Sequence, residues 1–75
     1  MPRYFFNVYD GHDDIDREGT ELRDLDHAKS EAVNLAGRSI ADMGDSFWAS
    51  GREWLLEVTE SSSTVLFALK FSATR

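Results

Sequence analysis

Hydrophobic and polar residues alternate in three stretches of the chain and recur at a helical spacing in a fourth. The alternating stretches are residues 3–9, 53–60 and 64–72, and each places its apolar side chains on one face of a predicted strand. A further short strand is expected within residues 13–22, either around Ile15 or at the end of that range. The pattern therefore predicts four strands.

The helical spacing predicts one helix over residues 25–43. Asp24 is a suitable N-cap, and Asp26 adds a first-turn acid that favours the positive end of the helix dipole. Gly44 follows the last periodic residue and suits the C-terminal cap, whereas Gly37 in mid-helix indicates close approach of a neighbouring strand or chain. One apolar stripe runs along the helix, formed by Leu25, Ala28, Ala32, Leu35, Ala36, Ile40 and Met43.

The order of elements predicts an α+β fold of the ββαββ type in a single domain over residues 1–75. One helix covers only one face of a mostly antiparallel four-stranded sheet. Residues 45–52 are expected to be a loop, and residues 61–63, three serines, a turn between the last two strands. The predicted core consists of Tyr4, Phe6, Val8, Leu25, Ala28, Ala32, Leu35, Ile40, Trp54, Leu56, Val58, Val65, Phe67, Leu69 and Phe71.

The face of the sheet that the helix leaves open is the candidate interaction surface. Apolar residues on that face, together with an aromatic residue in the 45–52 loop, make up the predicted set: Phe5, Tyr9, Trp48, Leu55 and Leu66. The alternative is that they are scattered singly among charged residues. Phe47 and Trp48 have two interpretations, an interface anchor or, as we favour, a lid over the open end of the core.

Composition narrows the class of protein. The chain has 75 residues, of which 41% are hydrophobic, and no cysteine, so disulfides, cysteine-ligated zinc and thiol catalysis are excluded. Neither a signal peptide nor an apolar run long enough to span a membrane is visible, which predicts a cytoplasmic protein that does not bind membranes. The net charge of −6 counts against nucleic acid as a partner, including an RNA-binding role for the sheet aromatics.

The acidic segment over residues 10–21 has a spacing that resembles a calcium-binding loop. Its first, fifth, seventh and twelfth positions are Asp10, Asp14, Asp16 and Glu21. The sixth position is Ile15 instead of the glycine that the sharp turn needs, so a solvated acidic hairpin is the favoured interpretation. We predict neither a metal nor a cofactor, and the two histidines, His12 and His27, show no metal-ligand spacing.

Catalysis has little support in the sequence. Serine, histidine and acidic residues are all present, but none lies in a recognisable catalytic arrangement, and a domain with one helix offers little room for a pocket that separates two carboxyl pKa values. We therefore expect no catalytic residues and no enzymatic activity.

A family resemblance extends over nearly the whole chain. It begins with Met1-Pro2-Arg3-Tyr4-Phe5-Phe6-x-Val8-x-Asp10-Gly11, which resembles the opening of a family of short uncharacterised proteins common in rhizobia and related alphaproteobacteria. It continues in Glu18-Gly19-Thr20-Glu21-Leu22, in Asp24-Leu25 with Ala28, Glu31 and Ala32, in Trp54-Leu55-Leu56-Glu57-Val58, and in Val65-Leu66-Phe67-Ala68-Leu69-Lys70-Phe71. The resemblance implies a compact α+β domain and carries over no catalytic residue. The chain departs from the family at residues 61–63, where an Asp-Gly type of turn is usual.

A weaker similarity connects the chain to small antitoxins of the HicB type. It rests on the turn at Asp10-Gly11 and on a helix opened by an acidic cap and alanines, over residues 24–32, although the DNA-binding segment usual in such proteins is missing. We expect a cytoplasmic domain that acts by protein–protein contact, as a homodimer, because the chain is small, carries no cofactor signature and has apolar residues on both sheet faces. The alternative is an antitoxin that neutralises a small basic toxin.

Overall fold

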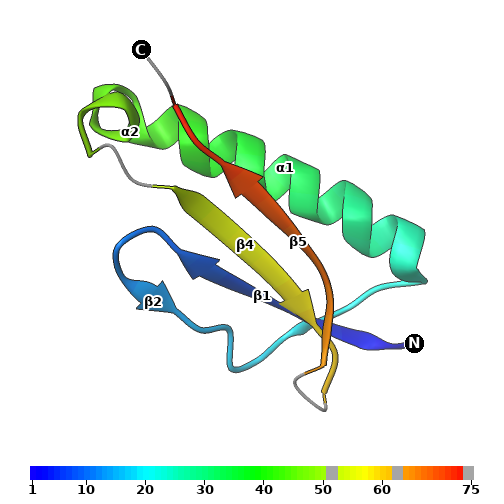
Figure 1. The fold of residues 1–75 in the computed structure, drawn as a ribbon. Helices are drawn as coiled ribbons and strands as arrows, with labels where there is room; N and C mark the ends of the chain where they lie inside the picture. The colour runs from blue at the N-terminus through cyan, green and yellow to red at the C-terminus, as the bar shows by residue number, and fades with distance from the viewer. Residues whose placement is uncertain (51–52, 62–63, 74–75) are drawn as a thin grey trace.

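The computed structural model describes residues 1–50, 53–61 and 64–73, apart from the side chains of residues 49 and 50. It has an α+β fold in which one long helix lies against one face of an antiparallel sheet (Figure 1). The elements are β1 (Arg3–Tyr9), β2 (Asp13–Asp14), β3 (Thr20–Glu21), α1 (Leu25–Met43), α2 (Asp45–Ser50), β4 (Trp54–Thr59) and β5 (Val65–Phe71).

The sheet has five strands instead of the predicted four, because the predicted second strand is divided into β2 and β3. Both short strands lie along the outer edge of β1: β2 pairs with Val8 and Tyr9, and β3 pairs with Arg3 and Tyr4. Residues 15–19 leave the edge between these two pairings. On its other side β1 pairs with β4, and β4 pairs with β5, so β5 forms the opposite edge of the sheet.

Helix α1 begins and ends with the caps that its sequence predicts. The Asp24 carboxylate accepts a hydrogen bond from the backbone N–H of His27 at 2.9 Å, and the N–H of Gly44 donates to the carbonyl of Ile40 at 3.3 Å. Gly44 has a φ of 55°, a conformation that favours glycine. A Cβ atom built on Gly37 has no neighbour within 4 Å among the described residues, so the predicted close approach of a neighbouring strand is wrong.

A second short helix, α2, replaces most of the loop expected over residues 45–52. Asp45 lies in its first turn, and the hydroxyl of Ser46 donates to the carbonyl of Met43 at 2.6 Å, which satisfies an acceptor at the end of α1. Residues 45–50 contain neither glycine nor proline, and this composition permits the helical turn. Residues 51–52 of the predicted loop and residues 62–63 of the predicted serine turn lie outside the described residues.

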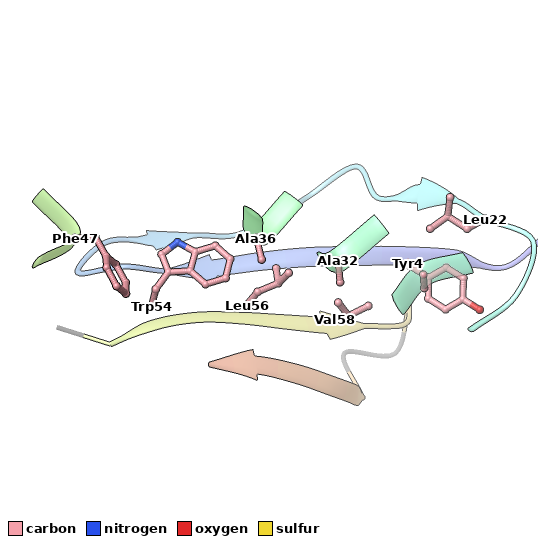
Figure 2. Close-up of a cluster of buried hydrophobic side chains, with 9 residues drawn as sticks. Tyr4, Leu22, Ala32, Ala36, Phe47, Trp54, Leu56 and Val58 are labelled. Atoms are coloured by element: carbon pink, nitrogen blue, oxygen red, sulfur yellow. The ribbon is translucent and has the colours of Figure 1, made fainter. Parts of the chain in front are cut away.

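The core forms where large side chains of β4 meet small side chains of α1. Figure 2 shows Trp54, Leu56 and Val58 on one face of β4, directed towards the alanines of the helix. Alanine at these positions lets the helix approach the sheet closely, and burial of each large side chain stabilises the fold by about 1.5–3 kcal/mol. The buried apolar residues are Tyr4, Leu22, Ala28, Ala32, Ala36, Phe47, Trp54, Leu56 and Val58.

Phe47 closes one end of this core, next to Trp54, so the lid interpretation is confirmed for Phe47 (Figure 2). It does not hold for Trp48, whose residue surface is 53% exposed. Three predicted core residues are also exposed, namely Leu25 at the start of α1 and Val65 and Phe71 at the two ends of β5. Phe71 is exposed because β5 is an edge strand that the helix covers only in part. Val65 is exposed because the register shift pairs it with Thr59, on the face of the sheet opposite the helix.

Candidate functional site

The predicted interaction residues lie on both sides of the sheet and do not form one patch. Tyr9 and Leu55 are cross-strand partners on the face that α1 leaves open, and Phe5 lies on the same face of β1; all three are half-buried. Leu66 lies at the irregularity in the β4–β5 pairing and packs against the core. Trp48 belongs to α2, outside the sheet, and is exposed.

A polar residue interrupts the apolar residues of the open face. Glu57 lies between Leu55 and Thr59 on β4, and its carboxylate forms a hydrogen bond with the Tyr9 hydroxyl. Burial raises the pKa of Tyr9 above its usual value, and the negative charges of Glu57 and Asp13 raise it further. The open face is therefore a mixture of apolar and charged side chains, and the interaction role of the predicted residues stays a prediction.

The side chain of Asp16, which lies between β2 and β3, accepts hydrogen bonds from three backbone N–H groups. Its Oδ2 atom accepts a hydrogen bond from the N–H of Phe6 at 3.2 Å, and its Oδ1 atom accepts from the N–H groups of Glu18 and Gly19 at 3.1 and 3.0 Å. In return, the N–H of Asp16 donates to Oδ1 of the buried Asn7 at 2.9 Å. One carboxylate thus substitutes for the missing strand beside Phe6.

These contacts determine the protonation of Asp16. Burial acts to raise its pKa, but the three backbone N–H donors and the nearby charge of Arg3 outweigh burial, so the pKa of Asp16 is lower than usual. The Arg3 guanidinium also donates to the carbonyl of Glu18 at 2.7 Å and pairs with Glu21 at 3.2 Å. The 15–19 segment is therefore held against the edge of β1 by two contacts, the bond of Asp16 to Phe6 and the bond of Arg3 to Glu18.

Gly19 allows this segment to return to the sheet. Its φ is 75°, and a Cβ atom there would lie 2.8 Å from Cγ of Arg3 and 2.9 Å from Cε2 of Phe5. A side chain at this position would strain the backbone and would lie too close to the side chains of Arg3 and Phe5. Glycine is thus required for the close passage over β1.

The acidic segment does not gather its carboxylates around a common point. Asp16 is occupied by backbone donors, Glu21 pairs with Arg3, and Asp10 accepts from the N–H of His12 at 3.3 Å. His27 faces Glu31 at 3.9 Å, one helical turn along α1. Within residues 1–50, 53–61 and 64–73 there is no group of three His, Cys, Asp or Glu residues placed to hold a metal ion.

The free edge of the sheet, β5, is apolar and partly uncovered. Val65 is 49% exposed and Phe71 38% exposed, although the Phe71 ring packs edge-to-face on Trp54 with centroids 5.7 Å apart. Its one charged residue is Lys70, whose ammonium lies 4.0 Å from the carboxylate of Glu53. Such an edge is a template for pairing with another strand.

The direction of the backbone groups on β5 follows from contacts at the opposite edge. The N–H of Phe6 donates to Asp16, and the carbonyl of Pro2 accepts from Leu22 at 3.0 Å, so the even-numbered residues of β1 direct their backbone groups away from β4. In an antiparallel pair, residues directly opposite each other either exchange both backbone hydrogen bonds or exchange none, in alternation. The odd-numbered residues of β1 are therefore the ones bonded to β4.

The same alternation continues across β4 to β5. Residues 54, 56 and 58 direct their backbone groups at β5, where their partners are Phe71, Leu69 and Phe67. Ala68 and Lys70 alternate with these residues, so their N–H and C=O groups point away from the sheet. Among the described residues these groups have no strand partner, and they form the unpaired backbone of the regular part of β5, since the pairing becomes irregular between Val58 and Thr59.

Sequence reasoning named Asp16 only as one position of a calcium-like spacing and missed its bonds to the backbone, and it also missed the edge position of β5. The spacing of Asp16 and Gly19 is compatible with a local turn in which the carboxylate bonds nearby N–H groups, and this signal is visible in the sequence. The bond to Phe6, ten residues away, has no local signal. The edge position of β5 depends on strand order, which alternation along a strand does not contain.

The fold and these features define a small α+β domain. One sheet edge is closed by short strands and a carboxylate, and the other edge has no pairing strand within the part of the chain that the structure describes. The model of a family described as a domain of unknown function (DUF6894) matches residues 3–72, so the chain belongs to this family. No curated protein and no solved structure matches the chain. In the described part of the chain, no helix has the length and apolar character needed to cross a membrane.

Proposed function

We propose that the chain is a non-catalytic interaction domain that works as a homodimer, with the free edge of β5 as the contact between the two copies. The observation that carries this proposal is the difference between the two sheet edges. Short strands, a bulging segment and the carboxylate of Asp16 close the β1 edge, and these are common protections against edge pairing. The regular part of β5 has only Lys70 as protection.

The distribution of charge supports a second copy as the partner at β5. Four exposed acids, Asp13, Asp14, Glu18 and Glu21, lie on the far side of the sheet, on β2, β3 and the segment between them. Contact through β5 would place these acidic edges at opposite ends of the dimer, beyond the screening length of about 10 Å at moderate salt. Contact through the β1 edge would bring them together.

Sedimentation equilibrium tests the proposal directly. The wild-type chain should show a mass that rises with concentration from 8.5 kDa towards twice that value. Ala68→Lys adds a charge to the exposed edge and should keep the chain monomeric, whereas the matched variant Ala41→Lys, on an exposed position of α1, should dimerise like the wild type. A wild-type mass that stays at 8.5 kDa at every concentration would refute the homodimer.

The HicB-like antitoxin remains the second candidate, and the exposed acids of residues 13–21 are the observation that favours it. A basic toxin would be attracted to that edge, and its binding would weaken as salt rises. A pull-down with a nuclease-treated control, followed by reconstitution with the purified partner, tests this function. One stoichiometric basic protein that binds the isolated chain in a salt-sensitive manner would place the antitoxin first.

A further inference from the structure

We propose that two copies join their β5 strands antiparallel around a two-fold axis at Leu69, so that Ala68 of each copy lies opposite Lys70 of the other. This inference rests on the proposed homodimer and specifies its register. It would produce one continuous sheet through both copies, with the two α1 helices on the same side.

The register follows from the backbone groups that β5 leaves unpaired. Within the regular part of the strand, these are the N–H and C=O groups of Ala68 and Lys70. With the axis at Leu69, the dimer contains two equivalent pairs, each formed by Ala68 of one copy and Lys70 of the other. The two residues of each pair exchange two backbone hydrogen bonds. All four unpaired groups of each copy are then satisfied, which is the requirement for a buried strand edge.

The two neighbouring registers, with the axis at Ala68 or at Lys70, give less favourable strand pairs. An axis at Ala68 would place Lys70 opposite Leu66, which lies in the irregular part of the β4–β5 pairing. An axis at Lys70 would place the two ammonium groups directly opposite each other, which destabilises a strand pair. In the proposed register each Lys70 faces the small side chain of Ala68 and keeps Glu53 of its own chain within 4.0 Å.

The side chains on the helix side of the sheet also match across this axis. Phe67, Leu69 and Phe71 share that face with the buried residues of β4, and none of the three is fully buried in one copy. In the proposed register Leu69 meets Leu69 of the second copy, and Phe67 meets Phe71 of the second copy. Aromatic and aliphatic cross-strand pairs of this kind stabilise sheets. The apolar core would thus continue from Trp54 through Phe71 into the second copy.

Disulfide trapping tests the register, because the chain has no cysteine of its own. Ala68→Cys and Lys70→Cys are both at exposed positions, and the two variants would be oxidised separately and as an equimolar mixture. Residues that are directly opposite in a bonded pair have Cα atoms about 5.5 Å apart, which is within the range of a disulfide. The mixture should give a 68–70 disulfide several-fold more abundant than either variant alone gives with itself. Ser30→Cys, on the solvent side of α1, is the control and should not cross-link.

The possible outcomes separate the register from the dimer. Efficient cross-linking of Ala68→Cys with itself would move the axis to Ala68, and that of Lys70→Cys with itself would move it to Lys70; either result overturns the register. A wild-type dimer by sedimentation without a 68–70 disulfide overturns the register and leaves the homodimer intact. A chain that is monomeric at all concentrations overturns the proposed function together with the register.

Discussion

Asp16 shows how one carboxylate can end the pairing of a sheet edge. Its two oxygens accept from three backbone N–H groups, including that of Phe6, which would otherwise be left without a partner. Asp16→Asn replaces one oxygen by an amide donor that faces an N–H group. We expect the free energy of unfolding to fall by about 1–2 kcal/mol, a value reduced for the partial exposure of the carboxylate. Urea denaturation at neutral pH measures this loss.

The same residue should give stability a dependence on pH. Because the pKa of Asp16 is lower in the folded chain, the folded state binds fewer protons than the unfolded state near that pKa. Its stabilisation is therefore complete above the unfolded value of about 3.9 and is lost as the pH falls towards the folded value. The difference between wild type and Asp16→Asn should shrink in acid. Asp14→Asn, at an exposed position of β2, is the control, and equal stabilities of the two variants at neutral pH would contradict this role.

Replacement of Gly19 and of Gly37 by alanine should change the stability of the fold in opposite directions. Gly19→Ala places a Cβ 2.9 Å from the Phe5 ring at a φ of 75°, and such strain costs about 1–3 kcal/mol. Gly37→Ala adds a methyl group to an open position of α1 and should stabilise the fold by about 1 kcal/mol. Thermal unfolding of both variants checks the signs. A loss of stability in Gly37→Ala would show that another chain approaches this position.

At the scale of elements, local patterns predict α1 best and the sheet edges least. The cap at Asp24 and the apolar stripe determine the ends and the buried face of α1 within a few residues of sequence. Alternation likewise predicts β1, β4 and β5. It does not predict that β2 and β3 are separate strands, because the chain between them is held by a contact of Asp16 with β1. It also does not predict which strand lies at an edge, and both the exposure of Phe71 and the candidate interface depend on that position.

The two directions of the β5 backbone predict different effects of proline at neighbouring positions. The N–H of Ala68 points away from β4, so Ala68→Pro should keep the fold and lower the association constant of the dimer by about tenfold or more, since each copy loses one intermolecular bond. The N–H of Leu69 points towards β4, so Leu69→Pro should remove a bond within the sheet and destabilise the monomer by about 3 kcal/mol or more. Circular dichroism and sedimentation separate these effects. Unfolding of Ala68→Pro would show that the assigned backbone direction is wrong.

At the scale of the whole molecule, the net charge of −6 opposes any contact between two copies. The fold reduces this repulsion by placing the acidic residues 13–21 on one side of the sheet and the nearly uncharged β5 on the other. The remaining repulsion acts over a long distance, and added salt screens it. The hydrogen bonds and apolar contacts of the proposed interface depend little on salt. A homodimer through β5 should therefore become tighter as salt rises.

If a basic protein binds at the acidic edge, its affinity should fall as salt rises, because salt screens the attraction between opposite charges. Sedimentation of the wild-type chain at low and high salt shows whether its self-association depends on uncharged contacts or on opposite charges. As a control, Lys70→Gln removes the one charge of β5, and its dimer should still become tighter as salt rises. If the wild-type dimer dissociates as salt rises, opposite charges hold the copies together, and the interface must then include the acidic edge instead of β5 alone.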